Sequence, residues 1–230
     1  MTITLGFDVY GTLIDTAGIS TALEAHLGDR ASAFAALWRA KQLEYAFRHG
    51  LMERYRDFSV CTTEALDFCC LHFHVAIPEA GRSALLDQYR TLPAFPDAKP
   101  GLIALKRAGF RLFAFSMGRR DDVNALLEHA GLNEYFIGVI SLEPEKLYKP
   151  SPAAYRHFVA AAQTVAADAW LVSGNSFDVL GAVGAGLNGA WVKRSPDAVL
   201  DPWDIAPTVI AESLPGLCDI LLTRAASKPG

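Results

Sequence analysis

Clusters of basic residues are missing from this sequence. The 21 lysines and arginines and the 25 aspartates and glutamates are mixed along the chain, and the formal net charge is −4. A basic stripe or patch is the electrostatic footprint of a nucleic-acid-binding protein. We therefore expect no nucleic-acid partner.

Long apolar runs are missing as well. The most apolar late stretch, residues 159–172, is interrupted by Gln163, Thr164 and Asp168, whereas a membrane-spanning helix needs about 20 consecutive apolar residues. The first residues, MTITLGFDVYGTLID, lack the basic and apolar segments of a signal peptide and are typical of a strand followed by a loop. We therefore expect a cytoplasmic protein that does not bind a membrane.

Cysteine is scarce, with 4 residues in 230, and nothing marks the chain as secreted, so we expect free thiols. Cys69 and Cys70 stand close to His72 and His74 and look at first like a metal site. Zinc sites space their ligands as C-x-x-C and H-x-x-x-H, and this group has neither spacing. We interpret these four residues as ordinary side chains of a helix and the loop that follows it.

What the sequence does contain is a rhythm of apolar runs and amphipathic stretches. Hydrophobic residues make up 51% of the chain, enough for a packed core. The predicted strands are residues 3–7, 111–116, 136–142, 170–173 and 189–193. The predicted helices between them are residues 101–108, 121–130, 152–162 and 177–185. Strands that alternate with helices form βαβ units, so we predict an α/β fold with a Rossmann-like parallel sheet.

Residues 15–89 break this rhythm, because their pattern is helical throughout. Residues 33–45 and 62–73 are the clearest helices, and Pro93, Pro96 and Pro100 mark the return to the strand–helix pattern. We therefore predict a core domain made of residues 1–14 and 94–230. A helical cap domain, residues 15–93, is inserted between its two parts.

One motif suggests a dinucleotide site but has the wrong context. Gly184, Gly186 and Gly189 fit G-x-G-x-x-G, a fingerprint that requires a strand before it and a helix after it. Here a predicted helix comes first and a predicted strand follows. We interpret the glycines as the turn at the end of a helix.

Polar residues that follow the predicted strands are the candidates for chemistry, because ligands of open parallel sheets bind beyond the carboxyl ends of the strands. One lysine, two carboxylates and several hydroxyls would be costly to bury together without a function. These residues are Asp8 and Thr12 after the first strand, Ser116 after the second, Lys149 past the third, and Ser173, Asn175 and Asp178 after the fourth.

The segment FDVYGTLID resembles the first motif of the haloacid dehalogenase superfamily, D-x-x-x-T, with Asp8 and Thr12 at its two defined positions. Residues similar to the second, third and fourth motifs follow in the same order: Ser116, Lys149 with Pro150, and the group of Ser173, Asn175 and Asp178. The helical insertion is similar to the cap of this family. Together these features span nearly the whole chain, and the resemblance implies that Asp8 is a covalent nucleophile.

Two positions depart from the phosphatases of this superfamily. Phosphatases carry a second aspartate two residues after the nucleophile, where this chain has Tyr10, and an acidic pair that holds Mg²⁺ in the fourth motif. The first residue of that pair is Asn175 here, which leaves only Asp178. Mg²⁺ prefers oxygen ligands. Both departures resemble the L-2-haloacid dehalogenases, which implies an enzyme that needs no metal or other cofactor.

The predicted cap extends this resemblance. The segment LWRAKQLEYAF is similar to a cap helix whose arginine faces the departing halide, which implies that role for Arg39. Phe58 stands at the position of an aromatic residue that lines the substrate pocket, and Tyr155 matches a tyrosine near the third motif. The resemblance also implies a homodimer.

Met117 departs from the dehalogenases themselves. They have Ser-Asn-Gly after the second strand, with an asparagine amide that helps to hold the halide, whereas this chain has Ser116, Met117 and Gly118. An apolar thioether replaces a hydrogen-bond donor. Opening of the strained ring of L-azetidine-2-carboxylate by a related enzyme therefore remains an alternative, as does a phosphatase.

The resemblance implies a reaction in two halves on a short 2-haloacid, a small-molecule substrate. Asp8 attacks C2 of an L-2-haloalkanoate, and water then hydrolyses the ester to a D-2-hydroxy acid. Thr12 orients Asp8, and Lys149 keeps it ionised. The remaining expected roles are the following: Ser116 and the amides near Tyr10 and Gly11 bind the substrate carboxylate, Met117, Phe58 and Tyr155 line its pocket, and Asp178 with Ser173 and Asn175 positions Lys149 and the hydrolytic water.

Overall fold

The computed structural model describes residues 3–226 of the chain and contains one six-stranded sheet. Neighbouring strands are parallel, in the order β3-β2-β1-β4-β5-β6. This confirms the predicted Rossmann-like sheet. The strands are β1 (Thr4–Phe7), β2 (Arg111–Ser116), β3 (Gly138–Ser141), β4 (Ala169–Ser173), β5 (Asn188–Val192) and β6 (Val209–Ala211).

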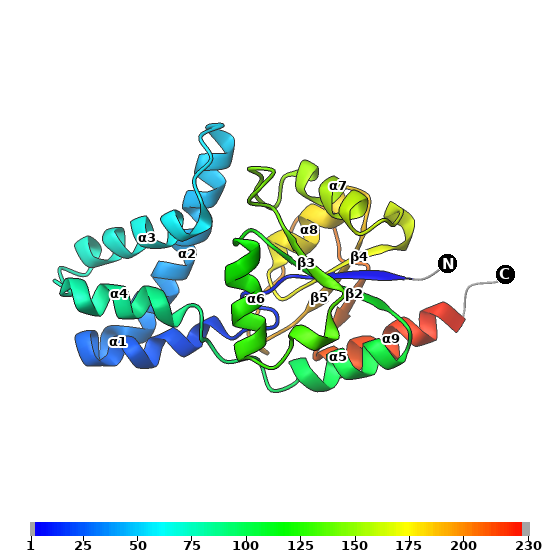
Figure 1. Ribbon diagram of the computed structural model, residues 1–230, viewed down its shortest axis with the longest axis horizontal. Helices are drawn as coiled ribbons and strands as arrows, with labels where there is room; N and C mark the ends of the chain where they lie inside the picture. Colours follow the sequence, from blue (N-terminus) through cyan, green and yellow to red (C-terminus); the bar gives the residue numbers. More distant parts are fainter. Residues whose placement is uncertain (1–2, 227–230) are drawn as a thin grey trace.

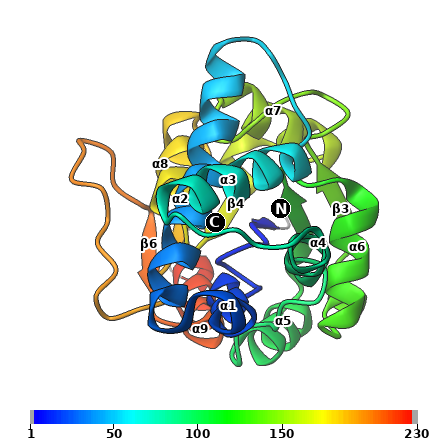
Figure 2. The ribbon, with the colours of Figure 1, turned by 90° about the vertical axis from the view of Figure 1, so that its left-hand side faces the viewer.

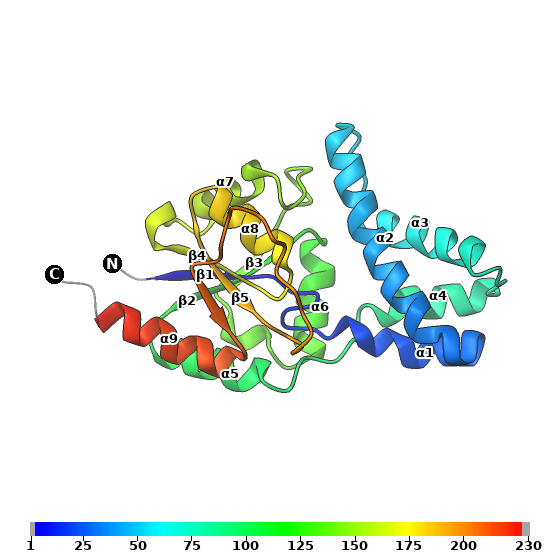
Figure 3. The ribbon, with the colours of Figure 1, turned by 180° about the vertical axis from the view of Figure 1, so that it is seen from behind.

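Helices cover both faces of the sheet (Figures 1 and 3). Helices α5 (Ala98–Arg107) and α9 (Leu214–Ala226) pack together on one face, whereas α7 (Pro152–Ala161) and α8 (Ser176–Gly184) lie on the other. Helix α6 (Arg120–His129) follows β2. These layers bury both faces of the strands, which explains why the strands are continuous apolar runs.

Three differences from the sequence prediction have physical reasons. Helix α5 begins at Ala98 rather than residue 101, because Pro100 falls within the first turn, where a helix needs no N–H donor. Strand β3 is shorter than predicted, since residues 133–135 form a 3₁₀ turn before it. Strand β6 and helix α9 were not predicted. The three residues of β6 are too few to show a strand pattern.

Register brings the candidate residues to one edge of the sheet. Phe7 of β1 pairs with Ala114 of β2 and Val172 of β4. The next residue, Asp8, continues the β1–β4 ladder by donating its N–H to the carbonyl of Val172 at 3.0 Å. Strand order reverses on either side of β1, and such a switch point is where open α/β sheets bind ligands.

The inserted segment forms a helical lobe at the carboxyl ends of the strands (Figures 1 and 2). Its helices are α1 (Ile19–Leu27), α2 (Ala31–Leu51), α3 (Phe58–His72) and α4 (Glu79–Gln88). Trp38 of α2 is fully buried, and its indole N–H donates to the carbonyl of Thr62 in α3 at 2.8 Å. This contact fixes α3 against α2.

The two chain crossings between lobe and sheet run side by side. The N–H of Asp15 donates to the carbonyl of Pro93 at 2.8 Å, and the N–H of Phe95 donates to the carbonyl of Leu13 at 2.9 Å. Ile14 and Ala94 form an antiparallel bridge between them. The division into a core of residues 1–14 and 94–230 and a cap of residues 15–93 stays a prediction.

Two suggestive sequence motifs have ordinary places in the fold. Gly184 ends α8, Gly186 has φ +88° in the turn, and Gly189 lies in β5, so the order is helix, turn, strand. Within residues 3–226, the structure brings no three histidine, cysteine or acidic side chains together as metal ligands. Across the same residues, no helix combines the length and hydropathy that a membrane crossing requires.

Candidate active site

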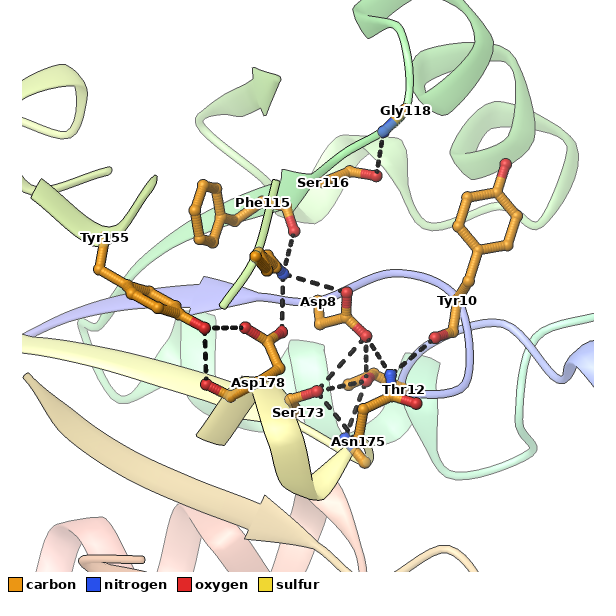
Figure 4. Close-up of polar contacts among 12 residues, drawn as sticks. Asp8, Tyr10, Thr12, Phe115, Ser116, Gly118, Tyr155, Ser173, Asn175 and Asp178 are labelled. Atoms are coloured by element: carbon orange, nitrogen blue, oxygen red, sulfur yellow. Dashed lines mark hydrogen bonds and ion pairs between the residues drawn. The ribbon is translucent and has the colours of Figure 1, made fainter. Parts of the chain in front are cut away.

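The carboxylate of Asp8 is the centre of a hydrogen-bond network (Figure 4). Its Oδ2 atom accepts from Thr12 Oγ1 at 2.8 Å, from Asn175 Nδ2 at 2.8 Å and from Ser173 Oγ at 3.4 Å. Its Oδ1 atom accepts from Lys149 Nζ at 3.1 Å. The two oxygens therefore differ, since Oδ2 is surrounded by donors and Oδ1 faces one cation.

Backbone amides fix the direction of these hydrogen bonds. The N–H of Gly174 donates to Thr12 Oγ1 at 2.8 Å, and the N–H of Asn175 donates to Ser173 Oγ at 3.0 Å. Because both hydroxyl oxygens act as acceptors, their hydrogens are available to Asp8. Asn175 Nδ2 also donates to the carbonyl of Tyr10 at 3.0 Å, and two acceptors at one atom identify it as the amide nitrogen.

Lys149 is 1% exposed, and all three of its hydrogens have acceptors. Its Nζ donates to Asp8 Oδ1, to Asp178 Oδ2 at 2.7 Å and to the carbonyl of Phe115 at 2.9 Å. Burial lowers the pKa of the Lys149 ammonium, but the carboxylates of Asp178 and Asp8 outweigh burial and raise it above its usual value. Lys149 therefore remains charged beside Asp8.

Asp178 is fully buried behind Lys149. Burial raises the pKa of its carboxyl to about 6, against the attraction of Lys149, and the charge of Asp8 adds to the rise. Its Oδ1 accepts from the hydroxyl of Tyr155 at 2.9 Å. Tyr155 was expected to line the substrate pocket, but it is fully buried and its hydroxyl donates to Asp178. Its contact is with the buried carboxyl of Asp178.

The loop after β1 depends on a glycine. Gly11 has φ +81°, which a residue with a side chain rarely adopts, and a Cβ there would lie 3.3 Å from Asn175 Oδ1. The amide of Gly11 was expected to bind substrate, but it donates to the carbonyl of Ile14 at 2.8 Å. Gly11 therefore contributes backbone shape rather than a free donor. Within residues 3–226, the N–H of Tyr10 has no acceptor.

A cavity of about 370 Å³ lies between the lobe and the sheet, next to this network. Arg39, Phe58 and Tyr89 line it from the lobe, and Tyr10 and Gly118 line it from the other side. Asp8 does not line it. The carbonyl of Tyr10 connects the hydrogen-bond network of Asp8 to the cavity, because it accepts from both Asn175 and Arg39 Nη2, the latter at 3.3 Å.

Ser116 and Met117 lie at the end of β2. Ser116 Oγ accepts the N–H of Gly118 at 3.1 Å, which leaves its hydrogen free to donate. Met117 is 9% exposed and belongs to the apolar cluster that contains Phe58 and Phe115. Met117 is therefore part of the apolar core, and it does not line the cavity, whereas the neighbouring Gly118 does.

Two polar residues near the cavity were not anticipated from the sequence. Gln42 of α2 is fully buried, and its amide joins Arg39 to the hydroxyl of Tyr89. The position of Gln42 in the sequence could have indicated its role, because Gln42 follows Arg39 by three residues and therefore lies on the same helix face. Tyr89 directly follows α4 and gives no local signal.

Comparisons with known proteins identify the family of the chain. A family model described as haloacid dehalogenase-like hydrolase matches residues 4–186. The chain belongs to this family. The (S)-2-haloacid dehalogenase of Pseudomonas sp. (strain YL) is 32% identical to it over 221 residues, 96% of this chain and 95% of that one. (S)-2-haloacid dehalogenase 1 of Pseudomonas sp. (strain CBS-3) is 37% identical over 191 residues, 82% of this chain and 83% of that one.

Solved structures of family members have the same architecture. The L-2-haloacid dehalogenase of Xanthobacter autotrophicus with chloropropionic acid covalently bound superimposes with a TM-score of 0.90 at 29% identity. The match covers 96% of this chain and 99% of that one. Both the predicted superfamily and the predicted dehalogenase branch are confirmed.

Proposed function

We propose that this haloacid dehalogenase-like hydrolase cleaves the carbon–halogen bond of L-2-haloalkanoic acids and releases D-2-hydroxy acids, through an ester on Asp8. The names of its relatives support this activity, and so does the bound chloropropionic acid in the Xanthobacter enzyme. The resident residues supply the nucleophile, its cation and a cavity for a small organic acid.

The observation that carries the proposal is the hydrogen bond from the amide nitrogen of Asn175 to the carboxylate of Asp8. Asn175 Nδ2 donates to Oδ2 at 2.8 Å, and Lys149 Nζ occupies the Oδ1 side. Mg²⁺ requires oxygen ligands with free lone pairs, whereas these groups present hydrogens. Tyr10 also provides no carboxyl to protonate an alkoxide. This donor set does not fit the magnesium-dependent phosphatase alternative.

In the first half of the reaction, Oδ1 of Asp8 attacks C2 and the halide leaves with the bonding electrons. Oδ2 already accepts three hydrogen bonds, whereas Oδ1 accepts one and keeps lone pairs for bonding. The Lys149 ammonium keeps Asp8 ionised, as a cation within hydrogen-bond distance does. Attack from the side opposite the leaving group inverts the centre.

In the second half, Oδ2 is the carbonyl oxygen of the ester. Water attacks Cγ of Asp8, and negative charge develops on Oδ2, which Thr12, Ser173 and Asn175 stabilise as an oxyanion hole. Lys149 stays protonated. Lys149 gives one proton to the carboxyl of Asp178, whose pKa burial raises to about 6, as it receives one from the water. When the intermediate collapses, the bond between Cγ and Oδ1 breaks, and the proton returns through Lys149 to Oδ1, which leaves as the hydroxyl oxygen of the product.

The substrate carboxylate needs donors on the Asp8 side of the cavity. The hydroxyl of Ser116 and the N–H of Tyr10 are free to serve, whereas the amide of Gly11 is engaged by Ile14. Phe58 provides an apolar wall beside C2 and its alkyl group. Arg39 faces the leaving group from the lobe.

The direct test is release of halide from L-2-chloropropionate. We expect chloride and D-lactate in equal amounts, no turnover of the D enantiomer, and unchanged rates after EDTA. Chloride is measured by ion chromatography and lactate by chiral separation. Loss of activity under EDTA that Mg²⁺ restores, or phosphate release from phosphate esters, would contradict the dehalogenase proposal and favour the phosphatase alternative.

Met117 decides between halide release and the azetidine-type ring opening. In Met117→Asn we expect faster turnover of chlorinated and brominated substrates, with a gain limited to about 1.5–3 kcal/mol by one hydrogen bond to a charged group. Met117→Leu is the matched control, because it preserves apolar packing without a donor. If Met117→Asn instead loses the best activity of the wild type, ring opening of L-azetidine-2-carboxylate becomes the leading function.

The homodimer and the cytoplasmic location remain proposals. Leu51, Met52 and Leu71 are large apolar side chains of the lobe that are exposed, at 86%, 56% and 76%. Exposed apolar surface of this kind is typical of subunit contacts. Light scattering gives the mass in solution.

A further inference from the structure

Within residues 3–226, Arg39 is a cation without an anionic partner. Its Nη2 donates to the carbonyl of Tyr10 and its Nη1 to Gln42 Oε1, each at 3.3 Å, and both acceptors are neutral. In the part of the chain that the structure describes, it forms no ion pair. Arg39 also lines the cavity. An uncompensated guanidinium at a cavity wall favours an anion in that cavity.

Gln42 holds a second cavity residue in place. Arg39 can only donate, so the oxygen of the Gln42 amide must face it and the amide nitrogen must face the other way. That nitrogen donates to the hydroxyl oxygen of Tyr89 at 2.7 Å. Gln42 is fully buried, so both contacts are fixed in orientation.

The hydroxyl of Tyr89 has a hydrogen to give. Its oxygen accepts from Gln42, and within residues 3–226 its own O–H donates to no acceptor. The ring packs edge-on against Trp38, 5.1 Å between centroids, and lines the cavity with Arg39. Burial raises the pKa of Tyr89 to about 12, against the charge of Arg39, so the phenol stays protonated.

We propose that the Tyr89 hydroxyl, oriented by Gln42, donates a hydrogen bond to the departing halide beside Arg39. Tyr89 is then a catalytic residue of carbon–halogen cleavage, and Gln42 is a positioning residue for both donors. As Oδ1 of Asp8 bonds to C2, the carbon–halogen electron pair leaves with the halide, and Tyr89 keeps its proton. The inference rests on the proposed dehalogenase function.

The identity of the halogen provides the test. Chloride is smaller than iodide and concentrates the same charge, so it gains more from a hydrogen bond in the transition state. The quantity kcat/KM includes every step through carbon–halogen cleavage, whereas kcat also reports ester hydrolysis. A donor to the halide therefore affects kcat/KM for the chlorinated substrate most, whereas a general loss of structure affects all halides equally.

We would measure kcat/KM for L-2-chloro-, L-2-bromo- and L-2-iodopropionate with wild type and Tyr89→Phe. For Tyr89→Phe we expect a loss of about tenfold or more on the chloro substrate, as for one hydrogen bond to a charged group. The loss should decrease from chloro to bromo to iodo. Gln42→Leu should shift the chloro-to-iodo ratio in the same direction.

Tyr45→Phe is the matched control. It removes a tyrosine hydroxyl from the same lobe, in a different surface groove that Met52 and Phe68 also line, and should leave all three rates unchanged. Equal losses of Tyr89→Phe on all three substrates would assign Tyr89 to the substrate carboxylate or to structure and overturn the inference. Absence of halide release from wild type would instead contradict the proposed function.

The variant Tyr89→Phe leaves the buried nitrogen of Gln42 without a partner, and this can destabilise the fold. The double variant Gln42→Leu/Tyr89→Phe removes both partners and avoids that unpaired group. If the chloro-to-iodo ratio of the double variant equals that of wild type, the inference is wrong.

Discussion

A single turnover of L-2-chloropropionate in ¹⁸O-water should give unlabelled lactate and leave the ¹⁸O in the side chain of Asp8. The reason is the asymmetry of this carboxylate. Oδ1 becomes the hydroxyl oxygen of the product, and water replaces it at Cγ while the donors around Oδ2 hold the developing charge. Mass spectrometry of lactate and of the peptide that contains Asp8 locates the label, with enzyme in excess over substrate.

Repeated turnovers provide the internal control, because labelled Asp8 then passes ¹⁸O to later products. Label in lactate on the first turnover would mean that water attacks C2 directly. Asp8→Asn should lower turnover by about 10⁴-fold or more, as loss of a nucleophile does. An amide at this position also presents its NH₂ to Lys149 when its oxygen faces Thr12, so two donors meet.

Lys149→Met should produce the largest loss of stability among single substitutions at the site. It leaves the fully buried carboxylate of Asp178 without its cation. Breaking a buried pair in this way costs about 3–5 kcal/mol, which corresponds to a fall in Tm of about 6–20 °C in a chain of this length. Turnover should fall by about 10²-fold or more, because the charge beside Oδ1 is lost.

The double variant Lys149→Met/Asp178→Asn separates stability from catalysis. It removes the buried charge along with its partner, so we expect part of the lost Tm to return while turnover stays low. Calorimetry and halide release measure the two effects. Substantial turnover by Lys149→Met, or no difference in Tm between the single and double variants, would contradict the role assigned to this pair.

The sequence predicted correctly which polar residues lie close together. It did not predict the direction in which each polar group points. Asp8, Thr12, Lys149, Ser173, Asn175 and Asp178 all enter one network, because each follows a strand of the same parallel sheet. The amide of Gly11 and the hydroxyl of Tyr155 have partners other than those expected. Sequence spacing does not specify which acceptor a donor reaches.

Gln42 and Tyr89 show a second limit. They are 47 residues apart and meet only because α2 and the end of α4 pack against each other. Each residue alone is an ordinary member of an amphipathic helix or its end, and no local pattern marks it as functional. Strand β6 and helix α9 were missed for a related reason, since short segments become regular only when a neighbouring strand or helix supports them.

The sequence by itself determined the parallel α/β core, the helical insertion after the first strand and the carboxylate, Asp8, that we propose as the nucleophile. Apolar periodicity specifies which elements form, and chain order determines which polar residues follow the strands. The tertiary structure decided which oxygen of Asp8 accepts fewer hydrogen bonds, where Tyr155 donates and that Tyr89 lines the cavity with Arg39. These properties depend on contacts between residues far apart in the chain, which only the packing of the lobe and the sheet brings within hydrogen-bond distance.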